Sequence, residues 1–369
     1  MALFGLSVKE TYKLLLMVAI ATLAFGVVGF VLISLMQLVS MQGFATDSVH
    51  KHGIAEMQAS RLGGAATIFG GVIVLIVLAL NGRDADGSGP LMVDWLAWIA
   101  VIGCMLLGLV EDISNQSLSP RLRLLAKASI FGFVLFQWPE LVPSALGIPL
   151  LDQLLSFPVL AFGLCLIFCV GFLNAVNMAD GANGLISGIA VMAFLIFVNE
   201  FDGIGFLAVL IACAVFLIFN VISGRLFLGD AGSYGVGASL LITSLVLYAN
   251  DMASLSFLAA VSCYPCVDFL VSIVRRLVKG QPVMQPDNDH LHNRIHFQYR
   301  KFFKSKNMAN SASGLSIACA STGTVLWGYL AGWWSINSDQ WAWVFLAQCV
   351  AYGLAYYLTA RSALERQAA

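Results

Sequence analysis

Long uninterrupted runs of apolar residues dominate this chain, and short polar stretches separate them. Six runs approach the roughly 20 residues that a membrane-spanning helix needs, at 14–38, 62–82, 206–224, 234–250, 314–334 and 341–360. Five shorter or interrupted runs lie at 95–110, 122–138, 158–176, 184–199 and 255–274. The pattern predicts an all-α fold, a polytopic integral membrane helical bundle of about eleven transmembrane helices. The first run is too long for a signal peptide, which favours an uncleaved helix.

Composition supports this prediction and excludes several other classes of protein. The 369 residues are 60% hydrophobic and only 11% charged, whereas a soluble domain is about 25% charged. A soluble domain, a nucleic-acid-binding protein and a disordered chain are therefore excluded. All eight cysteines lie within apolar runs, where a thiol is usually a small buried hydrophobe. Only Cys263 and Cys266 have CxxC spacing, and their apolar setting disfavours a redox role.

The basic residues predict an orientation in the membrane. With eleven spans, sixteen of the 19 Lys and Arg residues fall on one side, and only Lys9, Lys13 and Arg83 fall on the other. Because positive charge marks the cytoplasmic side, we expect the N-terminus outside and the C-terminus inside. The sequence has no Pro- or Ser-rich linker and no visible repeat, so we expect one transmembrane domain over 1–369 with a cytoplasmic loop at 275–313.

Acidic residues on the two sides of the membrane have different surroundings. Those expected outside are scattered in short turns, whereas those expected inside lie in Gly- and Asn-rich segments at the ends of spans. These segments are Gly108-Leu-Val-Glu-Asp-Ile, Asn174-Ala-Val-Asn-Met-Ala-Asp-Gly-Ala-Asn-Gly-Leu and Phe227-Leu-Gly-Asp-Ala-Gly-Ser. Clustered carboxylates without thiolates favour Mg²⁺ or Mn²⁺, and glycine N–H groups suit an anion. Together they predict a metal–diphosphate site at the cytoplasmic surface.

These segments resemble, in order, the motifs of the polyprenyl-phosphate N-acetylhexosamine-1-phosphate transferases, a family like glycosyltransferase family 4. Arg61-Leu-Gly-Gly resembles the PRxGG motif, and Gly108-Leu-Val-Glu-Asp resembles GxxDD. The Asn174 segment is similar to NxxNxxDGxDGL, the Phe227 segment to FMGDAGS, and Pro286-Asp-Asn-Asp-His-Leu-His to PDxxHxHH. The resemblance covers roughly residues 61–296, and eleven spans fit the branch that transfers GlcNAc 1-phosphate from UDP-GlcNAc to undecaprenyl phosphate.

The resemblance implies an enzyme that transfers an N-acetylhexosamine 1-phosphate from a UDP-sugar to a polyprenyl phosphate and releases UMP. It implies Mg²⁺, with Mn²⁺ as a substitute, and a role in starting a lipid-linked cell-surface glycan such as O-antigen. It leaves the oligomeric state open, a homodimer included. The implied catalytic residues are Glu111, Asp112, Asp180, Asp230, His290 and His292, and Asp230 and Asp112 are the expected metal ligands. The implied substrate-binding residues are Arg61, Lys127, Asn174, Asn177, Asn183 and Arg294.

Three positions depart from the family pattern. Glu111 replaces the first Asp of GxxDD, Asn183 replaces the second Asp of DGxDG, and Asn293 replaces the last His of HxHH. We expect Glu111 to supply negative charge near the metal rather than act as an obligatory base, so that Glu111→Asp would keep more activity than Glu111→Gln. We expect the Asn183 amide to hydrogen-bond uridine or sugar.

Several alternatives remain open at this stage. A zinc site of His290, His292 and His296 lacks a thiolate and the spacing of a closed structural site. The sister branch transfers phospho-N-acetylmuramoyl-pentapeptide. A secondary transporter or cation channel also uses intramembrane acids and broken helices, but its site should lie near the bilayer midplane. For the transferase we favour direct attack by the lipid phosphate over a covalent aspartyl-phosphate.

Overall fold

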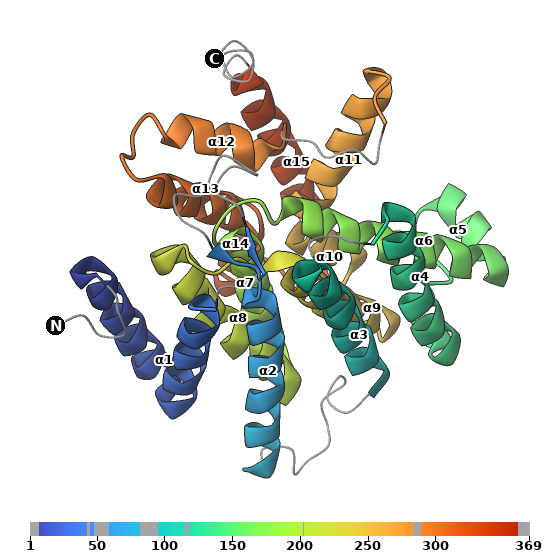
Figure 1. The fold of residues 1–369 in the computed structure, drawn as a ribbon. Helices are drawn as coiled ribbons and strands as arrows, with labels where there is room; N and C mark the ends of the chain where they lie inside the picture. Colours follow the sequence, from blue (N-terminus) through green and yellow to red (C-terminus); the bar gives the residue numbers. More distant parts are fainter. Residues whose placement is uncertain are drawn as a thin grey trace.

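The computed structural model describes residues 7–42, 45–47, 59–81, 95–114, 118–201, 203–282 and 289–360. Within these ranges the chain is almost wholly helical (Figure 1). The helices are α1 (Val8–Ser40), α2 (Gly63–Leu80), α3 (Trp95–Ile113), α4 (Pro120–Gln137), η2 (Pro139–Leu141), α5 (Pro149–Leu155), α6 (Pro158–Ala179), α7 (Leu185–Glu200), α8 (Ile204–Ser223), α9 (Gly229–Ala249), α10 (Leu255–Val261), α11 (Cys263–Val278), α12 (Leu291–Tyr299), α13 (Lys306–Ala320), α14 (Thr322–Leu330) and α15 (Trp341–Leu358). Two short strands, β1 (Thr46–Asp47) and β2 (Ala59–Ser60), pair antiparallel.

The expected class of fold, an all-α polytopic membrane bundle, is confirmed. All eleven expected segments lie on helices or on pairs of helices. Within the described residues, seven helices are long and apolar enough to cross a membrane on their own, or eight if α10 and α11 count as one span bent by 77°. The others fall short because α7 has only 16 residues, because α4 carries three basic residues, and because α13 and α14 are separated by a break.

Helix α9 occupies the centre of the bundle and positions the site. In the apolar stretch of α9, 89% of the residues are buried inside the protein. Helices α2, α3 and α6 pack around it. The first half of α9 is rich in small residues, including Gly232, Gly235 and Gly237, which allow close approach between membrane helices. The N-terminus of α9 therefore lies at the centre of one end of the bundle.

The polar connection expected at 275–313 is not a simple loop. Helix α11 continues to Val278, α12 occupies Leu291–Tyr299, and α13 already begins at Lys306. The ends of α11 and α15 lie together with α12 at the upper end of Figure 1. Residues 283–288, which include Pro286 of the PDxxHxHH-like motif, lie outside the described residues.

Helix α1 differs from the single straight span that its hydropathy predicts. Gly26 has φ 61° and ψ −143°, so the chain turns sharply there and α1 forms two arms (Figure 1). A Cβ atom on Gly29 would overlap the carbonyl oxygen of Ala21, although eight residues of straight helix span about 12 Å. Glycine tolerates this φ because it lacks a Cβ atom.

The bend brings the N-terminal end of α1 to the same end of the bundle as Arg225, and the expected position of the N-terminus outside stays a prediction. The Glu10 carboxylate lies 2.7 Å from the Arg225 guanidinium, and Arg225 belongs to the set of basic residues assigned to the inside. Both ends of α1 thus lie on the side of the bundle that holds Arg225. Lys9 and Lys13 therefore lie at the same end of the bundle as Arg225.

Backbone pairing joins the segment before α2 to the segment before α9. Ser60 forms a parallel bridge with Leu226, and the N–H groups of Gly63 and Gly64 donate to the carbonyls of Phe227 and Leu228 at 3.1 and 2.8 Å. A Cβ atom on Gly64 would overlap the backbone of Gly232. The Arg61 motif and the Asp230 motif are therefore held against each other by main-chain contacts.

Candidate active site

Asp112 and Asp230 meet where α3 ends and α9 begins. The two carboxylate oxygens of Asp112 accept hydrogen bonds from the backbone N–H groups of Asp230 and Ala231, at 3.0 and 2.8 Å. The N-cap residue of α9, Leu228, has no capping side chain, so Asp112 caps this helix from a neighbouring one. Each Asp112 oxygen keeps a further lone pair for another partner.

Asp230 carries the strongest sign of a cation-binding role. Its Oδ2 atom is buried and has no hydrogen-bond partner within the described part of the chain. The Asn177 side chain hydrogen-bonds the same carboxylate, and the Ser233 hydroxyl donates to Asn177 Oδ1 at 2.7 Å. A buried charged oxygen without a partner is costly, which a bound cation would relieve.

Asp180 lies just beyond the end of α6 and faces the other two carboxylates. Burial, followed by the negative charges of Asp230 and Asp112, raises the pKa of Asp180 to about 8. Such crowding of like charges disfavours ionisation. A divalent cation near these three groups would favour their ionised forms.

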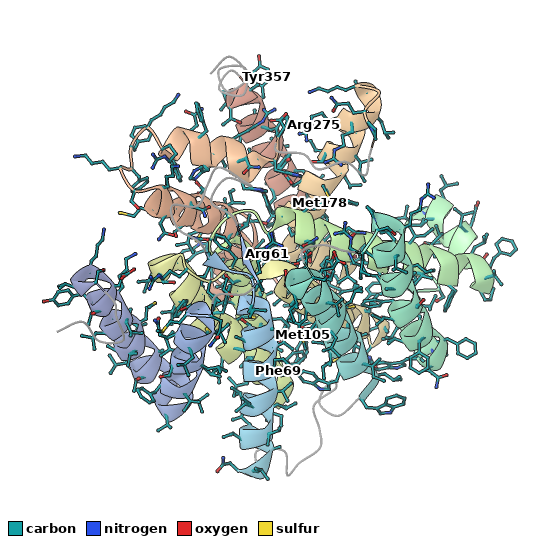
Figure 2. The ribbon with its side chains drawn as sticks, in the orientation of Figure 1. Arg61, Phe69, Met105, Met178, Arg275 and Tyr357 are labelled. Carbon is teal, nitrogen blue, oxygen red and sulfur yellow. The ribbon has the colours of Figure 1, made fainter. Side chains whose placement is uncertain are left out.

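Cationic side chains lie beside the carboxylates. Lys127 of α4 is buried, donates to Asn174 Oδ1 at 2.7 Å and lies 3.8 Å above the Tyr234 ring. Arg61 is also buried, and its charge acts on both Asp112 and Asp230. Figure 2 shows Arg61 at the top of α2, above Phe69 on the same helix, with Met178 near the same level.

Glu111 contacts the start of α4, and its charge acts on Lys127, which Asp230 also influences. It is fully buried, its Oε1 accepts the Leu118 N–H at 3.1 Å, and its Oε2 lies 3.5 Å from Arg123 Nη1. Arg123 in turn acts electrostatically on Asp230. Glu111 therefore fixes the α3–α4 connection and the position of Arg123.

Asn183 belongs to a network of amides rather than to an open pocket. Its Nδ2 donates to Asn307 Oδ1 at 3.0 Å, and its Oδ1 accepts from Asn220 Nδ2 at 3.3 Å. Asn220 also accepts the Gly184 N–H at 2.7 Å. These hydrogen bonds connect the α6–α7 turn to α8 and α13. They use both the donor and the acceptor of the Asn183 side chain, which gives a reason for an amide at position 183.

His290 and His292 are buried, and their rings stack nearly parallel, with centroids 5.3 Å apart and planes at 4°. A Cβ atom on Gly181 would overlap His292 Nε2, so His292 lies directly against the Asp180–Gly181 turn. His290 Nδ1 lies 2.6 Å from Asp268 Oδ2, and His292 Nδ1 lies 3.1 Å from the Tyr264 hydroxyl. His292, at the start of α12, thus lies beside the turn that holds Asp180, and His290 stacks on it.

Arg294 is engaged elsewhere. It donates to both carboxylate oxygens of Asp289 at 2.7 and 2.8 Å, and its guanidinium stacks 3.7 Å from the Tyr356 ring centroid. These Asp289 bonds raise the pKa of Arg294 against the opposing effect of burial. The contacts fix α12 on α15, and the expected substrate-binding role of Arg294 remains a prediction.

Sequence reasoning missed Asp268 and Tyr264 of α11 and Asn220 of α8. Asp268 had a detectable signal, because a carboxylate within an apolar run is unusual and marks a functional or paired group. Tyr264 and Asn220 gave none, since their roles depend on which helices are neighbours.

The residues fit a hydrated Mg²⁺-type ion better than a closed metal site. Among the described residues, no group of three or more His, Cys, Asp and Glu side chains is arranged to hold a metal by itself. Mg²⁺ commonly binds one or two carboxylates, substrate phosphates and water. Asp230, with its unpartnered oxygen, and Asp112 match that requirement.

Comparison with known proteins agrees with this geometry. Residues 95–248 match the model of glycosyl transferase family 4. A probable undecaprenyl-phosphate N-acetylglucosaminyl 1-phosphate transferase of Bacillus subtilis is 27% identical over 260 residues, covering 68% of this chain and 69% of the relative. The undecaprenyl-phosphate alpha-N-acetylglucosaminyl 1-phosphate transferase of Thermotoga maritima is 27% identical, covering 67% and 72%. A phospho-N-acetylmuramoyl-pentapeptide-transferase of Staphylococcus carnosus is 26% identical, covering 62% and 74%.

The fold and the site define a membrane-embedded sugar-phosphate transferase. Residues 95–248 are similar to glycosyl transferase family 4, whose members depend in general on a divalent metal.

Proposed function

We propose that this chain transfers an N-acetylhexosamine 1-phosphate, with GlcNAc 1-phosphate as the first candidate, from its UDP-sugar to undecaprenyl phosphate at the cytoplasmic face of the bacterial inner membrane. UMP is the second product, and the lipid product starts a cell-surface glycan. The observation that carries the proposal is the gathering of Asp112, Asp180 and Asp230 from three helix ends, beside buried Lys127 and against His292. Two of the relatives above act on this lipid by name.

The reaction replaces one phosphoanhydride with another, so it needs no ATP. A phosphate oxygen of the lipid attacks the β-phosphorus of the UDP-sugar, and the bond from that phosphorus to the oxygen of UMP breaks. A phosphomonoester with a second pKa near ~6 is already largely ionised at neutral pH, so a strong base is not required. Orientation and charge neutralisation are then the main tasks of the protein.

The side chains divide these tasks. Asp230 and Asp112 would hold Mg²⁺ or Mn²⁺, which supplies neutralisation of the diphosphate when bound. Lys127 and Arg61 bind and orient the phosphates, and His290 and His292 contact them from the loop. Asn174 and Asn177 hold Lys127 and Asp230 in place through the contacts described above.

The test is the release of UMP by the purified protein with undecaprenyl phosphate and a panel of UDP-sugars. We expect UMP from a UDP-N-acetylhexosamine, only when the lipid phosphate is present. Release of UDP instead would contradict sugar-phosphate transfer, and UMP from UDP-N-acetylmuramoyl-pentapeptide alone would assign the sister activity. Exchange of labelled UMP into the UDP-sugar without lipid would favour the covalent aspartyl-phosphate route.

A further inference from the structure

One face of α11 carries three polar side chains that contact the loop histidines. Tyr264, Asp268 and Ser272 are spaced by four residues, which places them on one side of a helix. Asp268 and Ser272 contact His290 Nδ1 at 2.6 and 3.3 Å, and Tyr264 contacts His292 Nδ1 at 3.1 Å. Both rings therefore direct their Nδ1 edges toward α11.

Because each ring's Nε2 lies across from its Nδ1 edge, the Nε2 atoms face away from α11. For His292 this direction is independently fixed, since its Nε2 lies against Gly181. For His290 the contacts of Nδ1 with Asp268 and Ser272 turn Nε2 away from α11. The shared face of α11 thus directs the His292 imidazole at the turn that holds Asp180 and holds His290 stacked beside it.

The Asp268 carboxylate has three hydrogen-bond partners, whereas capping α12 would require only the Leu291 N–H. Its Oδ1 accepts from the Tyr352 hydroxyl of α15 at 2.8 Å and from the Leu291 N–H at 3.2 Å, which leaves Oδ2 for His290. A buried carboxylate with three donors remains an acceptor. His290 Nδ1 must then carry the proton, because an ionised carboxylate cannot donate one.

We propose that Asp268 is a positioning residue that fixes the ring orientation and the Nδ1-protonated state of His290, and that Tyr264 positions His292 in the same way. Tyr352 holds Asp268 from behind. This inference rests on the proposed function for its activity readout. The competing possibility is that Asp268 serves only to anchor α12 through the Leu291 N–H.

The activity test is a double-mutant cycle. Loss of a charge-assisted hydrogen bond should lower kcat by about 10- to 100-fold in Asp268→Asn, with KM for the UDP-sugar within about twofold of wild type if the contact acts in the transition state. In a His290→Ala background, Asp268→Asn should change kcat by less than about threefold, because a residue acting through His290 has nothing left to orient. An equal further loss in that background would show that Asp268 is only an anchor and would overturn the proposal.

Tyrosine variants give a milder version of the same test. Tyr264→Phe and Tyr352→Phe keep the aromatic packing and remove one hydroxyl each, so we expect about 2- to 10-fold lower kcat from one lost hydrogen bond. Tyr357→Phe is the matched control on α15, because Tyr357 is exposed, and it should keep full activity. Wild-type kcat in both Tyr264→Phe and Tyr352→Phe would contradict the roles assigned to these hydroxyls.

A spectroscopic readout separates this proposal from the proposed function. The chain has five histidines, so an ¹⁵N-histidine spectrum of the full chain in detergent is simple, and His290→Ala identifies the His290 signals. We expect a hydrogen-bonded Nδ1–H signal for His290 that shifts or disappears in Asp268→Asn, while His50 and His52 signals stay constant. An unchanged His290 signal would overturn the proposal even if UMP release is confirmed. A wild-type protein that releases no UMP would refute the function and leave this readout intact.

Discussion

At the scale of single residues, the carboxylates that look alike in the sequence have different partners. Asp112 caps α9, Asp230 has an oxygen without a partner, and Glu111 contacts Leu118 and Arg123. The motif at Gly108 places Glu111 and Asp112 side by side in the chain. In a helix, however, adjacent residues point about 100° apart, and of the two it is Asp112 that accepts the N–H groups of the first turn of α9. The two residues should therefore respond differently to substitution.

Asp230→Asn should lower kcat by at least about 100-fold, because it removes a charged ligand of a metal that supplies several kcal/mol of transition-state stabilisation. Chelation by EDTA should abolish wild-type activity, and added Mg²⁺ or Mn²⁺ should restore it. Asp251→Asn is the matched control at the other end of α9, since Asp251 has φ 54°, a conformation that Asn also tolerates. UMP release by each variant measures the effect, and near-normal turnover in Asp230→Asn would remove this residue from the metal site.

The contacts of Glu111 give a physical reason to expect the opposite order of activity from the one that the sequence suggests. Glu111→Gln keeps the length of the side chain and the acceptor for the Leu118 N–H, and it loses only a 3.5 Å ion pair to the partly exposed Arg123. Glu111→Asp retracts the carboxylate by about 1.5 Å, one C–C bond, and breaks both contacts. We therefore expect Glu111→Gln to keep more activity than Glu111→Asp, by about 2- to 10-fold, the value of one hydrogen bond.

The kcat of both Glu111 variants, measured side by side at pH 6 to 8, checks this order. If Glu111→Asp were the more active enzyme, charge near the metal rather than the link to α4 would be the function of Glu111. Recovery of Glu111→Gln at high pH would instead identify Glu111 as a proton acceptor.

At the scale of secondary-structure elements, the turn between α6 and α7 is the point where the loop histidines reach the carboxylates. Gly181→Ala places a methyl group on His292 Nε2 and should displace the ring. A shift near 1 Å can lower kcat by ~100-fold when geometry is critical. Gly171→Ala is the matched control on α6, because a Cβ atom there meets nothing within 4 Å. Equal kcat for the two variants would show that His292 does not act from this position.

Sequence patterns located most elements and the three clustered aspartates, because apolar runs and Gly- and Asn-rich helix ends are local features. They could not identify Asp268 as the partner of His290, since that contact joins α11 to α12 across residues 283–288. They also failed at α1. Hydropathy measures how apolar a segment is and carries no information on backbone direction. The turn at Gly26 could therefore not be predicted from the hydropathy of this segment.

At the scale of the whole molecule, the bent α1 makes a prediction about topology that differs from that of a straight first span. Single cysteines replacing Lys9, Lys304 and Asn337, in a background without reactive thiols, should divide into two classes. Lys9→Cys and Lys304→Cys should react only from the cytoplasmic side, and Asn337→Cys, near the start of α15, only from outside. Labelling of Lys9→Cys from outside in intact cells would show that α1 crosses the membrane once.

The main-chain bridge between Ser60 and Leu226 also has a consequence for biosynthesis. Its two strands are separated by 166 residues of chain, which a ribosome needs about 8 to 33 s to synthesise at 5–20 residues per second. During that interval Arg61, Asp112 and Lys127 have already entered the membrane without the α9 terminus that they surround in the finished protein. A nascent chain arrested before Leu226 therefore lacks the N–H groups of Asp230 and Ala231 that the Asp112 carboxylate accepts in the finished protein, and a buried carboxylate without donors is costly. Membrane quality-control proteases should degrade chains truncated before this point much faster than the full-length protein.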